Sequence, residues 1–250
     1  MQAEEYGREN SEVIILLHGG GLSWWNFKNK AMLLKDRYHV ILPILDGHGG
    51  SDRAFTGIEN NAKEIIEYID RNFGGKVLLI GGLSLGAQIL LEILSQRSNI
   101  CRFAVIESAL AFPLKAENAY IRPAVKMSFG LISKRWFSKL QAASLRIPEV
   151  FFEDYYRDSC AISADDLISV LEANTAYSLK DSLKKSQAKV LILYGGRERG
   201  AIKSSAGLIE QAIPRSSSEM LCGLYHGEFS LGRPDEYVKR VERLISHNDF

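Results

Sequence analysis

Six short apolar runs, separated by longer stretches with helical periodicity, constrain the fold of this chain more than any other feature. The runs, most of them rich in Val, Ile and Leu, are VIILL (13–17), YHVILP (38–43), KVLLI (76–80), FAVIE (103–107), KVLILY (189–194) and SEMLC (218–222). Such runs are typical of strands buried on both faces. Between the second and third runs, from Ile58 to Phe73, apolar residues recur at spacings of three and four, as on an amphipathic helix. The alternation predicts an α/β fold with an open, mostly parallel, twisted sheet and helices on both faces.

The composition is that of a globular protein without a strong overall charge. The chain has 250 residues, of which 46% are apolar and 24% charged, so it can bury a sizeable core. Thirty-one Lys and Arg oppose thirty Asp and Glu, which leaves a net charge of +1. Because no global field favours nucleic acid or an anionic membrane, we expect neither as a partner, and the oligomeric state stays open.

The cysteines and the N-terminal segment bear on the compartment. Cys101, Cys160 and Cys222 are far apart and odd in number, which suggests neither a disulfide framework nor a zinc site. The first twelve residues, MQAEEYGRENSE, are acidic and polar, and no window approaches eighteen uninterrupted apolar residues. We therefore expect a cytoplasmic protein.

The fourth and fifth runs are separated by some seventy residues, far more than one crossover helix requires. This span contains helix-like pieces, among them AVKMSFGLISKRWFSKLQAA and SADDLISVLEANTAYSL, and is rich in aromatic residues. We interpret it as a helical cap over the carboxyl edge of the sheet. The predicted organisation is a core formed by residues 1–110 and 186–250, with a cap at 111–185.

A lone serine stands between two glycines where the third apolar run ends and another apolar segment begins. The pentapeptide is Gly82-Leu83-Ser84-Leu85-Gly86, between KVLLI and the helix-like LGAQILLEILSQ. The pattern predicts a tight strand-to-helix turn, with glycines needed because the backbone is strained and neighbouring main chains approach closely. Ser84 then projects from the carboxyl edge of the sheet, which is the context of a nucleophile elbow.

The motifs at the ends of the runs together resemble those of the α/β-hydrolase family. They are LLHGGG at the first run, DGHGGSD after the second, GLSLG after the third, YGGRE after the fifth and YHGEFSL after the sixth. The resemblance extends over almost the whole chain, and each motif follows its expected strand. It implies an α/β-hydrolase fold with a nucleophile, an acid and a histidine in that chain order.

His226 is the candidate general base. It lies four residues beyond the last run, in a glycine-flanked loop before a C-terminal amphipathic segment. From such a loop a histidine can accept the hydroxyl proton of Ser84 and later donate it to a leaving group. The resemblance also puts the catalytic histidine at this position.

The other histidines are expected to have different roles, and no cofactor is expected. His18 and His48 are expected to organise their loops through main-chain hydrogen bonds, while His39 begins a strand and His247 is in the tail. There is no P-loop and no His/Cys cluster, and HGGGLS lacks the spacing of a dinucleotide-binding turn. The sequence therefore indicates neither a metal nor an organic cofactor.

Two glutamates are candidates for the acid that orients the histidine. Glu198 follows the fifth run, three residues after Gly195, where the resemblance puts an Asp or a Glu. Asp is more usual at that position, so Glu is a mild departure, and the flanking Arg197 and Arg199 would also suit a solvated surface charge. Glu107 ends the fourth run, after which some family members place their acid. We predict Glu198 as the acid, with Glu107 as the alternative.

The glycine-rich loop after the first run is the expected source of an oxyanion donor. A tetrahedral intermediate requires two or more N–H groups aimed at one point. Leu85 supplies one from the start of its helix, and the resemblance puts the second at Gly20, with Gly21 as the alternative. Trp24 and Trp25 follow this loop and are candidates for lining the acyl pocket, although residues of this kind more often belong to the core.

These features predict a cofactor-free serine hydrolase that cleaves a small or medium ester, thioester or related acyl compound through an acyl-enzyme, with a small acyl molecule as its partner. A C–C bond hydrolase with the same triad and a non-catalytic ligand-binding receptor are alternatives. A lyase of the menaquinone-pathway type is a third alternative. The motif of such lyases resembles GYSLGGR, which has an arginine where this chain has Gln88. Four arginines of the cap remain candidates for binding an anionic substrate: Arg122, Arg135, Arg146 and Arg157.

Overall fold

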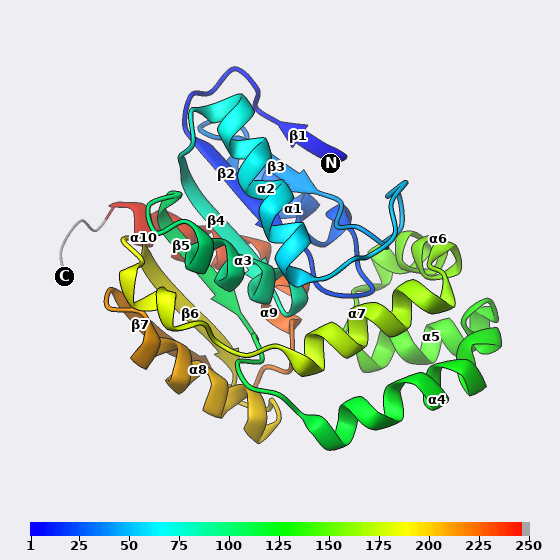
Figure 1. Ribbon diagram of the computed structural model, residues 1–250. Coiled ribbons are helices and arrows are strands. Elements are labelled where there is room, and N and C mark those ends of the chain that lie inside the picture. Colours follow the sequence, from blue (N-terminus) through cyan, green and yellow to red (C-terminus); the bar gives the residue numbers. More distant parts are fainter. Residues whose placement is uncertain (247–250) are drawn as a thin grey trace.

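The computed structural model describes residues 1–246 and is centred on a seven-stranded sheet (Figure 1). The strands are β1 (Ala3–Tyr6), β2 (Val13–Leu17), β3 (His39–Pro43), β4 (Val77–Leu83), β5 (Cys101–Glu107), β6 (Lys189–Gly195) and β7 (Ser216–Leu221). Their order in the sheet is β1-β3-β2-β4-β5-β6-β7. β1 is antiparallel to β3, and the other neighbouring pairs are parallel. The predicted α/β class with a mostly parallel sheet is confirmed.

Each of the six apolar runs forms a strand, whereas β1 was not expected from the sequence. Its sequence AEEY is short and carries two charges, so it lacks the apolar signal of the other strands. β1 lies at the edge of the sheet, where Ala3 pairs with Pro43 and Tyr6 with Val40. Charged side chains suit an edge strand because they oppose pairing with another chain.

Helices cover both faces of the sheet (Figure 1). One face is covered by α2 (Ile58–Phe73), α3 (Leu85–Gln96), η3 (Asp181–Lys185) and α8 (Gly200–Ala212). The other is covered by η1 (Trp24–Phe27), α1 (Lys28–Leu34), α9 (Glu228–Gly232) and α10 (Pro234–Ser246). Successive residues of β2 alternate between the two cores, with Ile15 in the first and Ile14 in the second. The sheet is therefore buried on both sides.

A group of helices between β5 and β6 extends beyond one end of the sheet (Figure 1). It comprises α4 (Lys115–Ile132), α5 (Arg135–Ser144), η2 (Glu149–Phe151), α6 (Phe152–Ala161) and α7 (Ala164–Ala176). We call α4–α7 the inserted helices. Their two ends meet, since the Leu114 N–H donates to the Thr175 carbonyl (2.8 Å) and the Leu179 N–H to the Ala111 carbonyl (3.3 Å). Within residues 1–246, no helix has the length and apolar character needed to cross a membrane.

Candidate active site

Ser84 lies at the sharp turn between β4 and α3. Its backbone has φ 51° and ψ −110°, a left-handed conformation that is strained for a residue with a side chain. The Ser84 N–H donates to the carbonyl of Glu107 at 2.8 Å, which ties the turn to the end of β5. Strain of this kind concentrates at functional sites, where the surroundings hold the backbone in place. The turn thus has the geometry that the sequence predicts for a nucleophile elbow.

The two glycines of the pentapeptide are required because main chains meet at this turn. A Cβ atom on Gly82 would lie 2.4 Å from the carbonyl oxygen of Gly86. A Cβ atom on Gly86 would lie 2.3 Å from the carbonyl oxygen of Leu17, at the end of β2. Both distances are far below van der Waals contact, and the obstacles are backbone atoms that cannot rotate away.

We expect Gly86→Ala to lower the free energy of unfolding by about 2 kcal/mol or more, because the new methyl group forces α3 away from β2. Gly207→Ala is the matched control, since Gly207 lies in α8 and a Cβ atom added there would have no other atom within 4 Å. There the helix propensity of Ala should add about 1 kcal/mol of stability. Urea unfolding measures both changes, and equal effects would contradict the close approach at Gly86.

His226 and Glu198 form a hydrogen-bonded pair at the ends of β6 and β7. Nδ1 of His226 lies 2.7 Å from Oε2 of Glu198, whose side chain is fully buried, whereas 44% of the His226 side chain is exposed. Oε1 of Glu198 accepts from the Ser108 hydroxyl and the Gly195 N–H, each at 2.7 Å. Burial alone would raise the pKa of Glu198, but the hydrogen bonds from His226, Gly195 and Ser108 outweigh it and lower that pKa. The carboxylate is therefore ionised and held in one orientation.

Ser84 and His226 border the same cavity of about 430 Å³, together with Ser108 and Glu198. No hydrogen bond joins the Ser84 hydroxyl to the His226 ring within the described chain, although catalytic hydrogen bonds often tighten only when substrate binds.

Ser108 is a residue of the site that the sequence did not predict. It follows the last residue of β5 and has φ 57°, but nothing in its local sequence distinguishes it from other serines.

Glu107, the alternative acid, makes no hydrogen bond to His226 within residues 1–246. Its Oε1 accepts from the Ser230 N–H of α9 at 3.1 Å. Complete burial raises the pKa of Glu107 to about 7, and burial lowers the pKa of the neighbouring Lys30 to about 7. The hydrogen bond to the His226 ring is thus made by Glu198, whereas Glu107 contacts α9.

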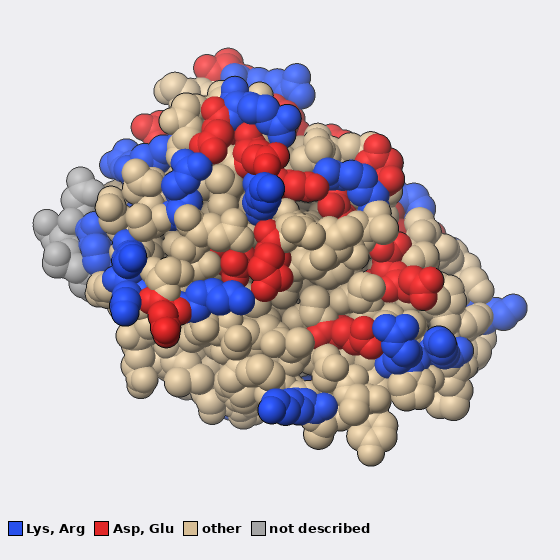
Figure 2. Space-filling view, in the orientation of Figure 1, with Lys and Arg blue, Asp and Glu red and all other residues tan. Residues whose placement is uncertain are grey.

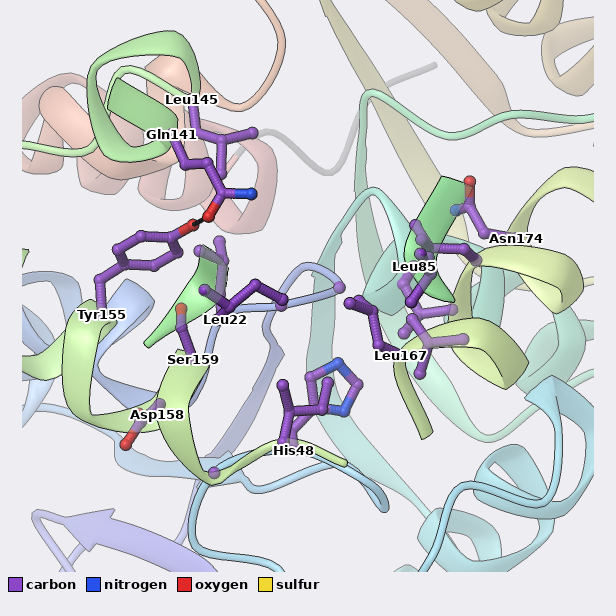
Figure 3. A pocket seen from close by; sticks show the side chains of 18 of the residues that line it. Leu22, His48, Leu85, Gln141, Leu145, Tyr155, Asp158, Ser159, Leu167 and Asn174 are labelled. Atoms are coloured by element: carbon purple, nitrogen blue, oxygen red, sulfur yellow. Dashed lines mark hydrogen bonds between the residues drawn. The ribbon is translucent and has the colours of Figure 1, made fainter. Parts of the chain in front are cut away.

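A second cavity, of about 390 Å³, also borders Ser84, and Figure 3 shows side chains that line it. We call it the acyl-side cavity. It is bordered by Gly20, Gly21 and Leu85, and within residues 1–246 the N–H groups of Gly20 and Gly21 have no hydrogen-bond acceptor. Most of its wall is apolar and comes from the core loops and the inserted helices, including Leu22, Val125, Ile132, Leu145, Leu167 and Leu171. None of the described residues that line it is a Lys or an Arg.

Comparison with known proteins shows the family of this chain. The sequence model of the alpha/beta hydrolase family matches residues 14–240. The chain belongs to the alpha/beta hydrolase family. The match begins in β2 and ends in α10, so it includes the glycine-rich loop, the elbow and the His226 loop.

Individual relatives of this hydrolase are distant. It is 22% identical over 250 residues to a pimeloyl-[acyl-carrier protein] methyl ester esterase of Photorhabdus laumondii, which covers 95% of this chain and 94% of that protein. It is 27% identical over 139 residues to an uncharacterized hydrolase of Bacillus subtilis, and this match spans 54% of the chain and only 50% of that relative. The solved structure of an esterase from Exiguobacterium antarcticum superposes with a TM-score of 0.81 at 20% identity, covering 97% of this chain and 94% of that one. At such identities the structural likeness supports the fold alone.

His18 and His48 of this hydrolase hold the loops beside the acyl-side cavity. The Leu45 N–H donates to Nε2 of His18 at 3.1 Å, so the ring carries its proton on Nδ1, which lies 2.9 Å from the Gly19 carbonyl. Burial lowers the pKa of His18 well below its ordinary value and keeps the ring neutral. Nδ1 of His48 lies 2.9 Å from the carbonyl of Asp46, and the ring lines the cavity. Both rings make the main-chain contacts that the sequence predicts.

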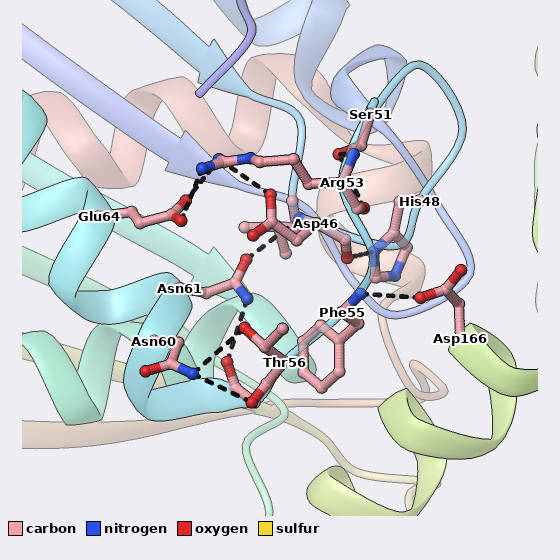
Figure 4. A network of polar contacts seen from close by, with 12 residues as sticks. Asp46, His48, Ser51, Arg53, Phe55, Thr56, Asn60, Asn61, Glu64 and Asp166 are labelled. Atoms are coloured by element: carbon pink, nitrogen blue, oxygen red, sulfur yellow. Dashed lines mark hydrogen bonds and ion pairs between the residues drawn. The ribbon is translucent and has the colours of Figure 1, made fainter.

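The loop that carries His48 is fixed by a polar network between the core and α7 (Figure 4). Arg53 contacts Asp46 at 3.0 Å and Glu64 of α2 at 2.6 Å. Asp166 of α7 accepts from the Phe55 N–H at 2.7 Å. The same loop is thus joined to a core helix and to an inserted helix, which fixes one wall of the cavity.

Gln88 occupies the position where the lyase motif has an arginine, and its amide is fully engaged. Nε2 donates to the carbonyls of Leu110 (3.0 Å) and Asn174 (2.9 Å), while Oε1 accepts from Nδ2 of Asn174 at 2.8 Å. The four arginines named above contact other side chains: Arg122 with Glu172, Arg135 with Glu153, Arg146 over the ring of Tyr225, and Arg157 with Asp154 and Asp158. None of them lines the acyl-side cavity.

Trp24 and Trp25, the candidates for lining the acyl pocket, differ in burial and contacts. Trp25 is completely buried, stacks near Phe151 (5.6 Å between ring centroids) and donates from Nε1 to Asp158 of α6 at 2.8 Å. Trp24 is half-buried, with Lys28 over its ring. Neither tryptophan is among the described residues that line the 390 Å³ or the 430 Å³ cavity beside Ser84. His247, expected to be non-catalytic, lies outside the described residues.

Proposed function

We propose that this protein is a serine hydrolase that cleaves small or medium, uncharged acyl esters or thioesters through an acyl-enzyme. The observation that carries the proposal is the position of Ser84 at a strained turn beside the His226–Glu198 pair, with both groups bordering one cavity. Family membership supports a hydrolase, and the Photorhabdus laumondii and Exiguobacterium antarcticum relatives, by their names, are esterases.

The acylation step begins at the Ser84 hydroxyl. His226 accepts the hydroxyl proton on Nε2 as the serine oxygen attacks the acyl carbon. Glu198 holds the proton of the imidazolium on Nδ1 and stabilises its positive charge through the 2.7 Å contact. Fixed by Ser108 and Gly195, the carboxylate needs little reorganisation as that charge develops.

The oxyanion that forms on the acyl oxygen is stabilised by backbone N–H groups. Leu85 begins α3 and lines the acyl-side cavity, and its N–H has no partner within the helix. Gly20 supplies the second donor, with Gly21 as the alternative. His226 then gives its proton to the departing alcohol or thiol, and a water molecule repeats the sequence to release the acid.

The two cavities hold different parts of the substrate, and both border Ser84. His226 borders only the 430 Å³ cavity, and because the leaving group takes its proton from His226, that group departs on this side. Gly20 and Leu85 border only the acyl-side cavity, so the acyl chain extends into it past the oxyanion donors. The acyl chain carries no anionic group, because no Lys or Arg is present among the described lining residues and most of the wall is apolar.

A fluorophosphonate probe together with p-nitrophenyl esters tests the proposal. We expect stoichiometric labelling of Ser84 and a burst of nitrophenol release when deacylation is slower than acylation. A ligand-binding receptor of this fold would bind the ester without turnover, and a protein that neither reacts with the probe nor hydrolyses any ester of the series contradicts the proposal.

Filling the acyl-side cavity should shorten the preferred acyl chain. Ser128 lines this cavity from α4, so Ser128→Phe should lower kcat/KM for an octanoyl ester by about 10-fold or more and leave acetyl ester turnover nearly unchanged. Ser144→Phe, on an exposed position of α5 outside the cavity, is the control. A uniform decrease for all chain lengths would mean that the cavity does not hold the acyl chain.

A further inference from the structure

Large apolar side chains are exposed on the first half of the inserted helices. Among the described residues, six large apolar side chains are more than half exposed, and five of these lie between residues 120 and 150. They are Tyr120 (73%), Met127 (86%), Trp136 (59%), Leu140 (63%) and Val150 (77%). Singly scattered apolar residues are ordinary on a protein surface, but this concentration on one segment indicates a binding surface.

The exposed apolar residues follow helical spacing. On α4, Tyr120, Met127 and Leu131 are separated by seven and four residues, so they lie along one side of the helix. On α5, Trp136 and Leu140 are separated by four residues and also share a side. Each helix therefore exposes one row of apolar side chains to water and buries a different side against the protein.

The same segment is strongly basic. Residues 115–146 contain seven Lys and Arg and one acidic residue, whereas residues 147–176 contain one basic and seven acidic residues. Lys126, Lys134 and Lys139 form no ion pair within residues 1–246. Figure 2 shows a broad tan area along the lower edge of the molecule, where α4 lies, with Lys and Arg side chains beside it. The net charge of the whole chain, +1, does not reflect this local excess of basic residues.

We propose that α4 and α5 dock this hydrolase onto the surface of an anionic lipid bilayer. The docking face consists of the apolar residues Tyr120, Met127, Leu131, Trp136 and Leu140 and the basic residues Lys126, Lys134 and Lys139. Helices that combine Trp, Met and Leu with Lys and Arg lie in the headgroup region, with apolar side chains entering the acyl boundary and cations facing anionic lipids. The expectation of no membrane partner, which rests on the net charge of the whole chain, is replaced by this proposal.

Other occupants fit the docking face less well. A second copy related by a two-fold axis would bring the two basic segments together, and like charges repel. Nucleic acid would use the lysines but leave the aliphatic side chains of Met127 and Leu140 without a role. A bilayer uses both kinds of side chain, and it also brings lipid-like acyl substrates to helices that line the acyl-side cavity through residues such as Val125 and Leu145.

Co-sedimentation with vesicles tests the proposal with the full chain. We expect binding to phosphatidylcholine vesicles that contain about a third phosphatidylglycerol, and binding at least 10-fold weaker to phosphatidylcholine alone. Salt at about 0.5 M should weaken the binding because it screens the lysines. If the protein does not bind the anionic vesicles, the proposal is wrong. This holds even if the docking face binds an acidic protein instead.

Two variants separate the apolar and basic contributions. We expect weaker vesicle binding, on the order of 100-fold, in the triple variant Lys126→Gln/Lys134→Gln/Lys139→Gln. The double variant Met127→Asp/Trp136→Asp should weaken vesicle binding by at least about 10-fold. Met220→Asp is the matched control, since Met220 is 54% exposed on β7, outside the docking face. All three variants should keep the urea midpoint of the wild type because the replaced side chains are exposed. Vesicle binding that is unchanged in either multiple variant would refute the docking face.

Discussion

We expect Ser84→Ala to lower ester turnover by a factor on the order of 10,000 or more and to prevent labelling by a fluorophosphonate. In the proposed mechanism the hydroxyl oxygen of Ser84 forms the acyl bond, and alanine has no atom that replaces it. Alanine fits the same turn, so the free energy of unfolding should change little. The measurement is kcat/KM for a p-nitrophenyl ester beside urea unfolding of each variant.

Ser128→Ala is the matched control for the nucleophile, because Ser128 lines the acyl-side cavity but its hydroxyl donates to the Ala124 carbonyl. This variant should retain activity and labelling. Ser84→Ala/His226→Ala should be hardly less active than either single variant, since residues that act as one proton-transfer unit are not additive. Appreciable esterase activity in Ser84→Ala would make the assignment of the nucleophile wrong.

We expect Glu198→Gln to lower kcat/KM on the order of 100-fold or more. The amide keeps the size of the carboxylate but cannot stabilise the imidazolium, and its NH₂ group disfavours the tautomer with a proton on Nδ1. Glu107→Gln is the control and should have little effect, because an amide oxygen can still accept from the Ser230 N–H. A large loss in Glu107→Gln with a small loss in Glu198→Gln would move the acid to β5, and small losses in both would indicate a Ser–His dyad.

The stability of Glu198→Gln should depend on pH in a defined direction. The pKa of Glu198 is lowered in the folded protein, so its ionised form stabilises the fold. This contribution is fully present above the ordinary pKa of a glutamate and is lost as the pH falls through the lowered value. The difference in urea midpoint between wild type and Glu198→Gln should therefore shrink on acidification through that range, and a constant difference would contradict the pKa shift.

The sheet and the elbow could be predicted because local sequence determines them. Buried parallel strands need continuous apolar residues, and the turn at Ser84 needs glycines on both sides, as the close approaches of Gly82 and Gly86 demonstrate. β1 escaped prediction because an edge strand buries little and AEEY carries no apolar periodicity.

The surroundings of the site depend on contacts between distant segments, which one sequence does not specify. Trp25 follows the glycine-rich loop, but its burial depends on Asp158, 133 positions away on α6. Ser108 becomes a donor to Glu198 only because β5 and β6 are neighbours in the sheet. The basic and apolar face of α4 and α5 was readable in the sequence as composition, but which apolar residues stay in water was decided by packing.

The meeting of the two ends of the inserted helices has a consequence for how this chain can change. Hydrogen bonds join Leu114 to Thr175, and Gln88 joins Leu110 to Asn174, so the segment leaves and re-enters the core through one narrow neck. A segment with adjacent ends can be lengthened, shortened or exchanged for another at small entropic cost without moving the strands beside it. Recombination between residues 115 and 176 would thus replace much of the wall of the acyl-side cavity and leave the chain at Ser84 unaltered, which under the proposed function would change the substrate and keep the chemistry.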